Sequence, residues 1–108
     1  MNINITEQDG KKIINLMGDI DLSCSADIRN QLLDHLGNNA ELLINLSEVN
    51  YIDSSGVASL VEAYQTCRKE EKSFALISVS NAAMSVLKLA RLDQVFPLFD
   101  SLEAYNSQ

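Results

Sequence analysis

Apolar and polar residues along this chain change their spacing several times, and the first spacing is that of β-strands. Two strand-like runs, at residues 2–6 and 12–17, flank the dipeptide Asp9-Gly10. Such a dipeptide readily takes the positive φ angles of a tight hairpin turn. The chain is therefore predicted to begin with a β-hairpin.

The spacing becomes helical after Gly18. One apolar stripe with a period near 3.6 residues is formed by Ile28, Leu32 and Leu36. Ser23 or Ser25 is available to cap the start of this helix, and the run at 37–39, Gly-Asn-Asn, is typical of a helix end. The first helix is thus predicted between these signals.

Strand-like and helix-like segments alternate over the rest of the chain. In chain order they are a buried strand at 42–46, a helix that follows YIDSSG at residues 51–56, a buried strand at 74–77, a helix opened by Ser80 or Asn81, an extended piece at 95–99 and a last helical turn or two at 101–105. The inward side of the third helix is predicted to hold Ala83, Val86, Leu87 and Ala90. This order predicts an α/β fold, in which a mixed sheet of four to five strands begins with the hairpin and continues through alternating helices and strands.

Parallel strands joined by right-handed crossovers place their strand-to-helix loops at one edge of the sheet. Three loops are expected there: Gly18 to Asp21, Asp53 to Gly56, and Ser78 to Asn81. His35 is expected at the end of the first helix, on the opposite edge from Ser54. That separation excludes a Ser-His-Asp triad.

Composition narrows the classes of function. The 108 residues, 46% of them apolar, are enough for one core, so a single domain at 1–108 is expected. A formal charge of −7 without a basic cluster argues against direct binding of nucleic acid or anionic membranes. Cys24 and Cys67 are expected to be buried thiols, and with no signal-like N-terminus the chain is predicted to be cytoplasmic. The single histidine leaves no metal site built from several imidazoles.

The segment YIDSSG, from Tyr51 to Gly56, places a carboxylate and two hydroxyls next to one another. Its simplest interpretation is a helix cap, in which Asp53 or a serine accepts hydrogen bonds from free backbone amides. Two adjacent hydroxyls exceed what a cap requires, and Gly56 costs about 1 kcal/mol of helix propensity while leaving the backbone open to a partner. No general base accompanies the serines, so a nucleophile is disfavoured. A hydroxyl phosphorylated by another protein needs no such base. Tyr51 is left open as either a core or an interface residue.

Three segments together resemble a known family. The stretch INLSEVNYIDSSGVASL is similar to the phosphorylation segment of STAS domains of the bacterial anti-sigma factor antagonist type, GDID at Gly18 to Asp21 resembles the family's G-[ED]-[LI]-D element, and RLDQVFPLFDSLEAY resembles its C-terminal segment. Two departures stand out. Asn45 replaces a frequent Asp, and Arg91 replaces a glycine that often ends the third helix, which leaves the geometry of that helix end open.

The resemblance implies a STAS fold and a partner-switching role. Ser54 corresponds to the family's phosphoacceptor. The unphosphorylated protein is expected to bind an anti-sigma factor that is also a GHKL-type serine kinase, and so to free a sigma factor. Phosphorylation of Ser54 would release the partner, and a PPM-type serine phosphatase would reset the switch. The resemblance implies neither enzymatic activity nor a cofactor.

Five residues are expected to support the phosphosite. They are Asp19, Asp21, Asp53, Ser55 and Gly56. Asp21 either positions the acceptor or the kinase's nucleotide, or caps the first helix. Ser55 is expected to be a cap and hydrogen-bond donor, and Asp19 to add negative charge to the same edge.

Two other classes of function compete with this interpretation. One is a STAS adaptor in another assembly, serving a response regulator, a phosphatase or a transporter. The other is a small enzyme or nucleotide-binding protein, which the lack of a P-loop, a G-x-G-x-x-G motif or a catalytic base disfavours.

Overall fold

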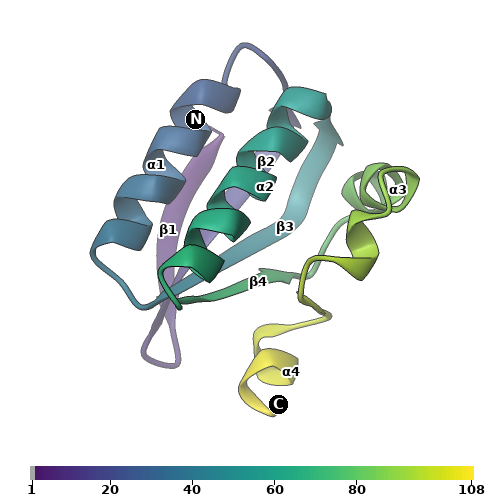
Figure 1. Cartoon of the computed structure of the whole chain (residues 1–108). Coiled ribbons are helices and arrows are strands. Elements are labelled where there is room, and N and C mark those ends of the chain that lie inside the picture. Colours follow the sequence, from purple (N-terminus) through teal and green to yellow (C-terminus); the bar gives the residue numbers. More distant parts are fainter. Residues whose placement is uncertain (1) are drawn as a thin grey trace.

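The structure is a computed structural model that describes residues 2–108; Met1, which the predicted domain includes, lies outside the described residues. Its elements are β1 (Ile3–Gln8), β2 (Lys11–Ile20), α1 (Ser25–Gly37), β3 (Glu41–Ile52), α2 (Ser54–Lys69), β4 (Ser73–Ile77), α3 (Asn81–Leu89), a 3-10 turn (Leu92–Gln94), β5 (Leu98–Phe99) and α4 (Leu102–Asn106). This order confirms the predicted alternation (Figure 1).

The five strands form one mixed sheet in the order β1-β2-β3-β4-β5. β1 and β2 are antiparallel, and the remaining neighbours are parallel. The hairpin turn has φ angles of 54° at Asp9 and 76° at Gly10, the left-handed values that the sequence favours. The predicted α/β fold class is therefore confirmed.

Helices α1 and α2 lie side by side over one face of the sheet, and α3 and α4 lie apart from them (Figure 1). The central strand β3 is buried on both faces, because Leu42 and Ile44 belong to the core on the α1 and α2 side while Leu43 packs in a second cluster with Leu102 and Tyr105 of α4. The prediction of a strand covered on both faces is confirmed.

Strands β2 and β3 are longer than predicted, and their extra length carries the start of α2 away from β4. β2 continues through the GDI sequence to Ile20 and β3 continues to Ile52, although Gly18, polar residues and two register irregularities interrupt their apolar pattern. β4 pairs with β3 only as far as Asn45. The last part of β3 therefore projects beyond β4 and carries α2 at its end.

Several local predictions are wrong. Helix α1 has Cys24 at its N-cap with no side-chain cap bond, so neither Ser23 nor Ser25 caps it. Ala90 is exposed rather than inward, because α3 ends at Leu89 and the chain turns away. The geometry at the end of α3, which the sequence left open, depends on Arg91. It adopts the left-handed conformation itself, with φ of 60°.

The two cysteines are free thiols; Cys67 is buried as expected, whereas the expectation is wrong for Cys24, which is only half-buried. Burial raises the pKa of the Cys67 thiol to about 11, so this side chain behaves as an uncharged core group. Between residues 2 and 108, no helix combines the length and apolarity that crossing a bilayer would take.

Candidate functional site

Ser54 is the first residue of α2 and is exposed at the end of the projecting part of β3. Its hydroxyl forms no hydrogen bond with any of residues 2–108, whereas the neighbouring Ser55 hydroxyl is engaged. The fold places this side chain at a helix N-terminus in open solvent. The hydroxyl is accessible to another protein and takes no part in the hydrogen bonds that cap α2.

Asp53 caps the same helix. Its backbone is extended, and its Oδ1 accepts hydrogen bonds from the Ser55 amide at 2.9 Å, the Gly56 amide at 3.1 Å and the Ser55 hydroxyl at 2.6 Å. The Ser55 hydroxyl, followed by the Gly56 amide, lowers the pKa of the Asp53 carboxyl, and the Leu22 amide acts in the same direction. The cap interpretation of Asp53 and the donor role of Ser55 are confirmed, and the carboxylate is ionised beside Ser54.

Gly56 has a different role from the one predicted. It is buried, and a Cβ atom at this position would lie 2.7 Å from Ile52 Cγ1 and 2.8 Å from Ile20 Cγ2. The glycine therefore lets α2 approach the ends of β2 and β3 closely. The prediction that it keeps the backbone open to a partner is wrong, because strand side chains cover it.

The loop between β2 and α1 lies beside the start of α2. The Asp53 amide donates to the Ile20 carbonyl at 3.1 Å, which joins the two segments. The Asp21 carboxylate accepts from the amide and hydroxyl of Ser23, at 3.0 and 2.6 Å, and the Asp21 carbonyl accepts from the amides of Cys24 and Ser25. Asp21 thus shapes the turn into α1 without capping that helix through its side chain.

Asp19 lies on β2 opposite Tyr51 of β3, one pair before the strand ends at Ile20 and Ile52. Asp19 and Tyr51 are both exposed. Asp19 therefore lies on the same edge of the sheet as Ser54. Because Tyr51 is exposed, it is not a core residue, which was one of the two alternatives left open for it.

The third predicted loop, Ser78 to Asn81, does not reach the end of β3. The Ser80 amide donates to the Leu46 carbonyl at 3.2 Å, and the Ser80 hydroxyl donates to the Val49 carbonyl at 2.7 Å. These partners precede Ser54 by five residues or more along an extended strand. The third loop thus follows the carboxyl end of a parallel strand as predicted, but it meets β3 well before Ser54, because β4 is much shorter than β3.

Sequence reasoning missed Leu22. Its side chain is 78% exposed in the loop whose backbone reaches Asp53, and Tyr51 is 52% exposed on the neighbouring strand end. A leucine this exposed has no part in the core. A run of polar residues around a single leucine offered the only signal in the sequence, and no periodicity distinguishes such a residue from a core position.

His35 lies near the end of α1, remote from Ser54 as predicted. Over residues 2–108, no three His, Cys, Asp or Glu side chains gather closely enough to hold a metal ion. What the Ser54 surface offers is an accessible hydroxyl, an ionised neighbour and two exposed apolar side chains. That combination suits protein recognition and the addition of a charged group.

Comparison with known proteins places the chain in a family. The family model of the STAS domain matches residues 2–105. The anti-sigma-B factor antagonist of Bacillus subtilis (strain 168) is 22% identical over 98 residues, which cover 91% of this chain and 90% of that protein. The crystal structure of an anti-sigma factor antagonist from Mycobacterium paratuberculosis superimposes with a TM-score of 0.83 at 24% identity, over 97% of this chain and 91% of that one. The Bacillus cell fate determinant SpoIIAA in its phosphorylated form gives a TM-score of 0.72 at 18% identity, over 97% of both chains. The resemblance seen in the three sequence segments is thus confirmed, and the chain belongs to the STAS domain family.

Proposed function

We propose that this protein is an anti-sigma factor antagonist whose binding to its partner is controlled by phosphorylation of Ser54. The observation that carries the proposal is the exposed hydroxyl at the first position of α2, which the fold leaves without a partner among residues 2–108. Relatives named anti-sigma factor antagonists, and a similar structure of SpoIIAA described as phosphorylated, support it.

Phosphorylation would act through charge. A phosphate adds about −1.5 to −2 charges at neutral pH. At Ser54 it would stand beside the ionised Asp53, on an edge that also carries Asp19 and Asp21. A partner surface that fits a neutral hydroxyl would meet repulsion and a desolvation cost. A loss of about 3 kcal/mol in binding free energy would weaken the complex more than a hundredfold.

The fold is expected to survive this change. Ser54 is exposed, and the Asp53 carboxylate caps α2 without using the Ser54 hydroxyl. The helix dipole favours a negative group at its N-terminus. However, the Ser55 and Gly56 amides already bind Asp53, so the phosphate would not gain those donors unless Asp53 moved aside. Phosphorylation would therefore alter the surface more than the core.

Two exposed apolar side chains define the rest of the proposed interface. Leu22 lies in the β2–α1 loop and Tyr51 near the end of β3, the two segments that adjoin the start of α2. Apolar and aromatic side chains of this kind frequently anchor protein interfaces. The partner is proposed to be an anti-sigma factor that is also a GHKL-type serine kinase, with a PPM-type phosphatase acting on the phosphorylated form.

A binding assay with matched variants tests the proposal. The partner is captured from cell extract with the Ser54→Ala protein, identified, and purified for titration against wild type, Ser54→Asp and Ser85→Asp. Ser85 is an exposed serine on α3, so its aspartate variant adds the same charge elsewhere. Ser54→Asp is expected to weaken binding at least about tenfold while Ser85→Asp binds as wild type does. Equal affinities for all three proteins would contradict the role of Ser54.

A further inference from the structure

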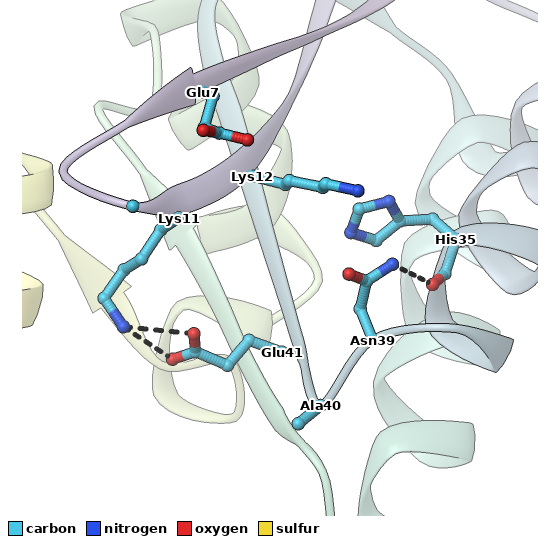
Figure 2. A pocket seen from close by; sticks show the side chains of 8 residues that line it. Glu7, Lys11, Lys12, His35, Asn39, Ala40 and Glu41 are labelled. Atoms are coloured by element: carbon cyan, nitrogen blue, oxygen red, sulfur yellow. Dashed lines mark hydrogen bonds and ion pairs between the residues drawn. The ribbon is translucent and has the colours of Figure 1, made fainter.

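A second polar site lies at the other end of the sheet from Ser54, where the hairpin meets the end of α1 (Figure 2). It is a cavity of about 170 Å³ lined mainly by Glu7, Lys11, Lys12, His35, Asn39 and Glu41. The residues come from the β1–β2 hairpin, the C-terminal part of α1 and the start of β3. Nothing in the proposed function of Ser54 uses this cavity.

His35 is the unusual member of the cavity. Its side chain belongs to a residue only 9% exposed, and its Nε2 atom is buried without a hydrogen-bond partner among the described residues. Buried polar atoms are normally paired, because leaving one unpaired costs free energy. A ligand that pairs with the imidazole would remove this cost.

Lys12 directs its ammonium group toward the His35 ring (Figure 2). Its neighbour Lys11 points away and forms an ion pair with Glu41 at 3.0 Å. Lys12 forms no ion pair with any of residues 2–108, and it lowers the pKa of the His35 imidazole, an effect second to that of burial. Two groups that can carry positive charge thus face each other with no anion between them.

A groove of about 350 Å³, lined by three isoleucines and by polar residues that include Asp34 and Gln31, shares part of its lining with this cavity. Lys12, His35 and Asn39 line both spaces, and the groove adds the isoleucines Ile3, Ile5 and Ile14. In the hairpin register Ile5 pairs with Ile14 and Glu7 pairs with Lys12, so all four side chains share the sheet face toward α1. Ile5 is 56% exposed, which leaves an apolar surface next to the charged cavity.

We propose that this combined site binds a small organic monoanion, a carboxylate with a short apolar chain. The carboxylate lies between Lys12 and His35, and the chain lies along Ile5 and Ile14. Glu7 disfavours a second negative charge on the ligand, because its carboxylate, across from Lys12, repels any anion and repels a dianion about twice as strongly as a monoanion. The ligand leaves the Ser54 surface free.

Binding is expected to be coupled to protonation of His35. Burial and Lys12 lower the pKa of the imidazole in the free protein. The other charged groups facing it are Glu7 from β1 and Asp34 from α1, while Lys11 and Glu41 are paired with each other. An anion placed against the ring favours its charged form, so the bound ligand raises this pKa. Affinity therefore increases as the pH falls.

Nuclear magnetic resonance of the single histidine tests the site directly. The probe is hexanoate, compared with acetate, hexanol and inorganic phosphate. Hexanoate is expected to shift the His35 ring signals and to raise the pH at which they titrate. Acetate is expected to bind more weakly, since each methylene group that is fully buried strengthens binding by about fourfold. Hexanol, which lacks the anion, is expected to leave the titration unchanged.

Variants separate the two halves of the site. Lys12→Gln is expected to abolish the hexanoate shift, whereas Lys88→Gln, which removes the same charge from the exposed end of α3, preserves it. Ile5→Ser is expected to weaken hexanoate but not acetate. Glu7→Gln is expected to strengthen both. Because these four side chains are exposed, the variants are expected to fold.

Several results would overturn the proposal. One is a His35 titration that hexanoate does not change. Another is an equal loss of binding in Lys12→Gln and Lys88→Gln, which would indicate general attraction to a charged protein. Tighter binding of inorganic phosphate than of hexanoate would refute the assignment of a carboxylate with an apolar chain.

Discussion

The Oδ1 atom of Asp53 accepts hydrogen bonds from both the hydroxyl and the amide of Ser55, at 2.6 and 2.9 Å. This pairing gives the two adjacent serines different roles. Ser55 helps to hold the start of α2, and Ser54 stands free at the surface. The same arrangement keeps an ionised carboxylate next to the hydroxyl that we propose to be phosphorylated.

The two serines are predicted to differ in their contribution to stability. Ser55→Ala removes a half-buried hydrogen bond and is expected to lower the free energy of unfolding by about 1 kcal/mol. Ser54→Ala removes only an exposed hydroxyl and is expected to stay within about 0.5 kcal/mol of wild type. Urea denaturation followed by circular dichroism measures both. A larger loss for Ser54→Ala would mean that its hydroxyl has a structural role.

Stability is predicted to depend on Asp53 at acidic pH. The pKa of this carboxyl is lower in the folded protein than in the unfolded chain. Its contribution to the free energy of unfolding is therefore fully present above the ordinary pKa of an aspartate, and it is lost as the pH falls below about 4 toward the folded-state value. Asp53→Asn cannot titrate, so its stability is expected to fall less steeply in this range. Parallel pH profiles for the two proteins would contradict the assignment.

Gly56→Ala is predicted to be destabilising. The added methyl group would overlap Ile20 and Ile52, and overpacking of this kind costs about 1–3 kcal/mol. The matched control is Gly37→Ala in the last turn of α1, where nothing beyond the adjacent residues and the helix's own backbone lies within 4 Å of the added carbon. The control is expected to raise the free energy of unfolding by about 0.5–1 kcal/mol. Equal effects of the two substitutions in urea denaturation would contradict the packing role of Gly56.

Arg91→Gly is predicted to be stabilising. Arg91 has a φ of 60°, a conformation that costs an L-residue about 1–2 kcal/mol and a glycine nothing. Because glycine also loses more backbone entropy on folding, the expected net gain is about 0.5–1 kcal/mol. Arg91→Ala keeps the strain and is expected to show no gain. If thermal unfolding gives both variants the same stability, the strain at this residue is not significant.

Patterns of local sequence predicted the order of elements, the hairpin and the position of Ser54. Each of these depends on a few neighbouring residues, such as Asp9 and Gly10 in the turn. Predictions that depend on tertiary contacts were less accurate. The extensions of β2 and β3 are stabilised by pairing with each other, which their polar residues conceal. For the same reason the close contact of Gly56 with Ile20 could not be seen in the sequence.

The site was predicted in outline and corrected in detail. Asp53 and Ser55 have the cap and donor roles expected of them, because capping depends on positions next to the helix start. The distance of the Ser80 loop from Ser54 was not predicted, because it depends on how far β3 extends beyond β4. The exposure of Leu22 depends on how its loop packs, and no periodic pattern encodes that.

The distribution of phosphate between bound and free protein tests the central claim most directly. The protein is recovered from cells in two fractions, with and without its anti-sigma partner, and mass spectrometry measures the occupancy of phosphate on Ser54 in each. Our account predicts an unmodified Ser54 in the complex and phosphate at this residue in the free fraction. The same phosphate occupancy in both fractions, or its absence from both while partner binding still varies with growth conditions, would contradict it.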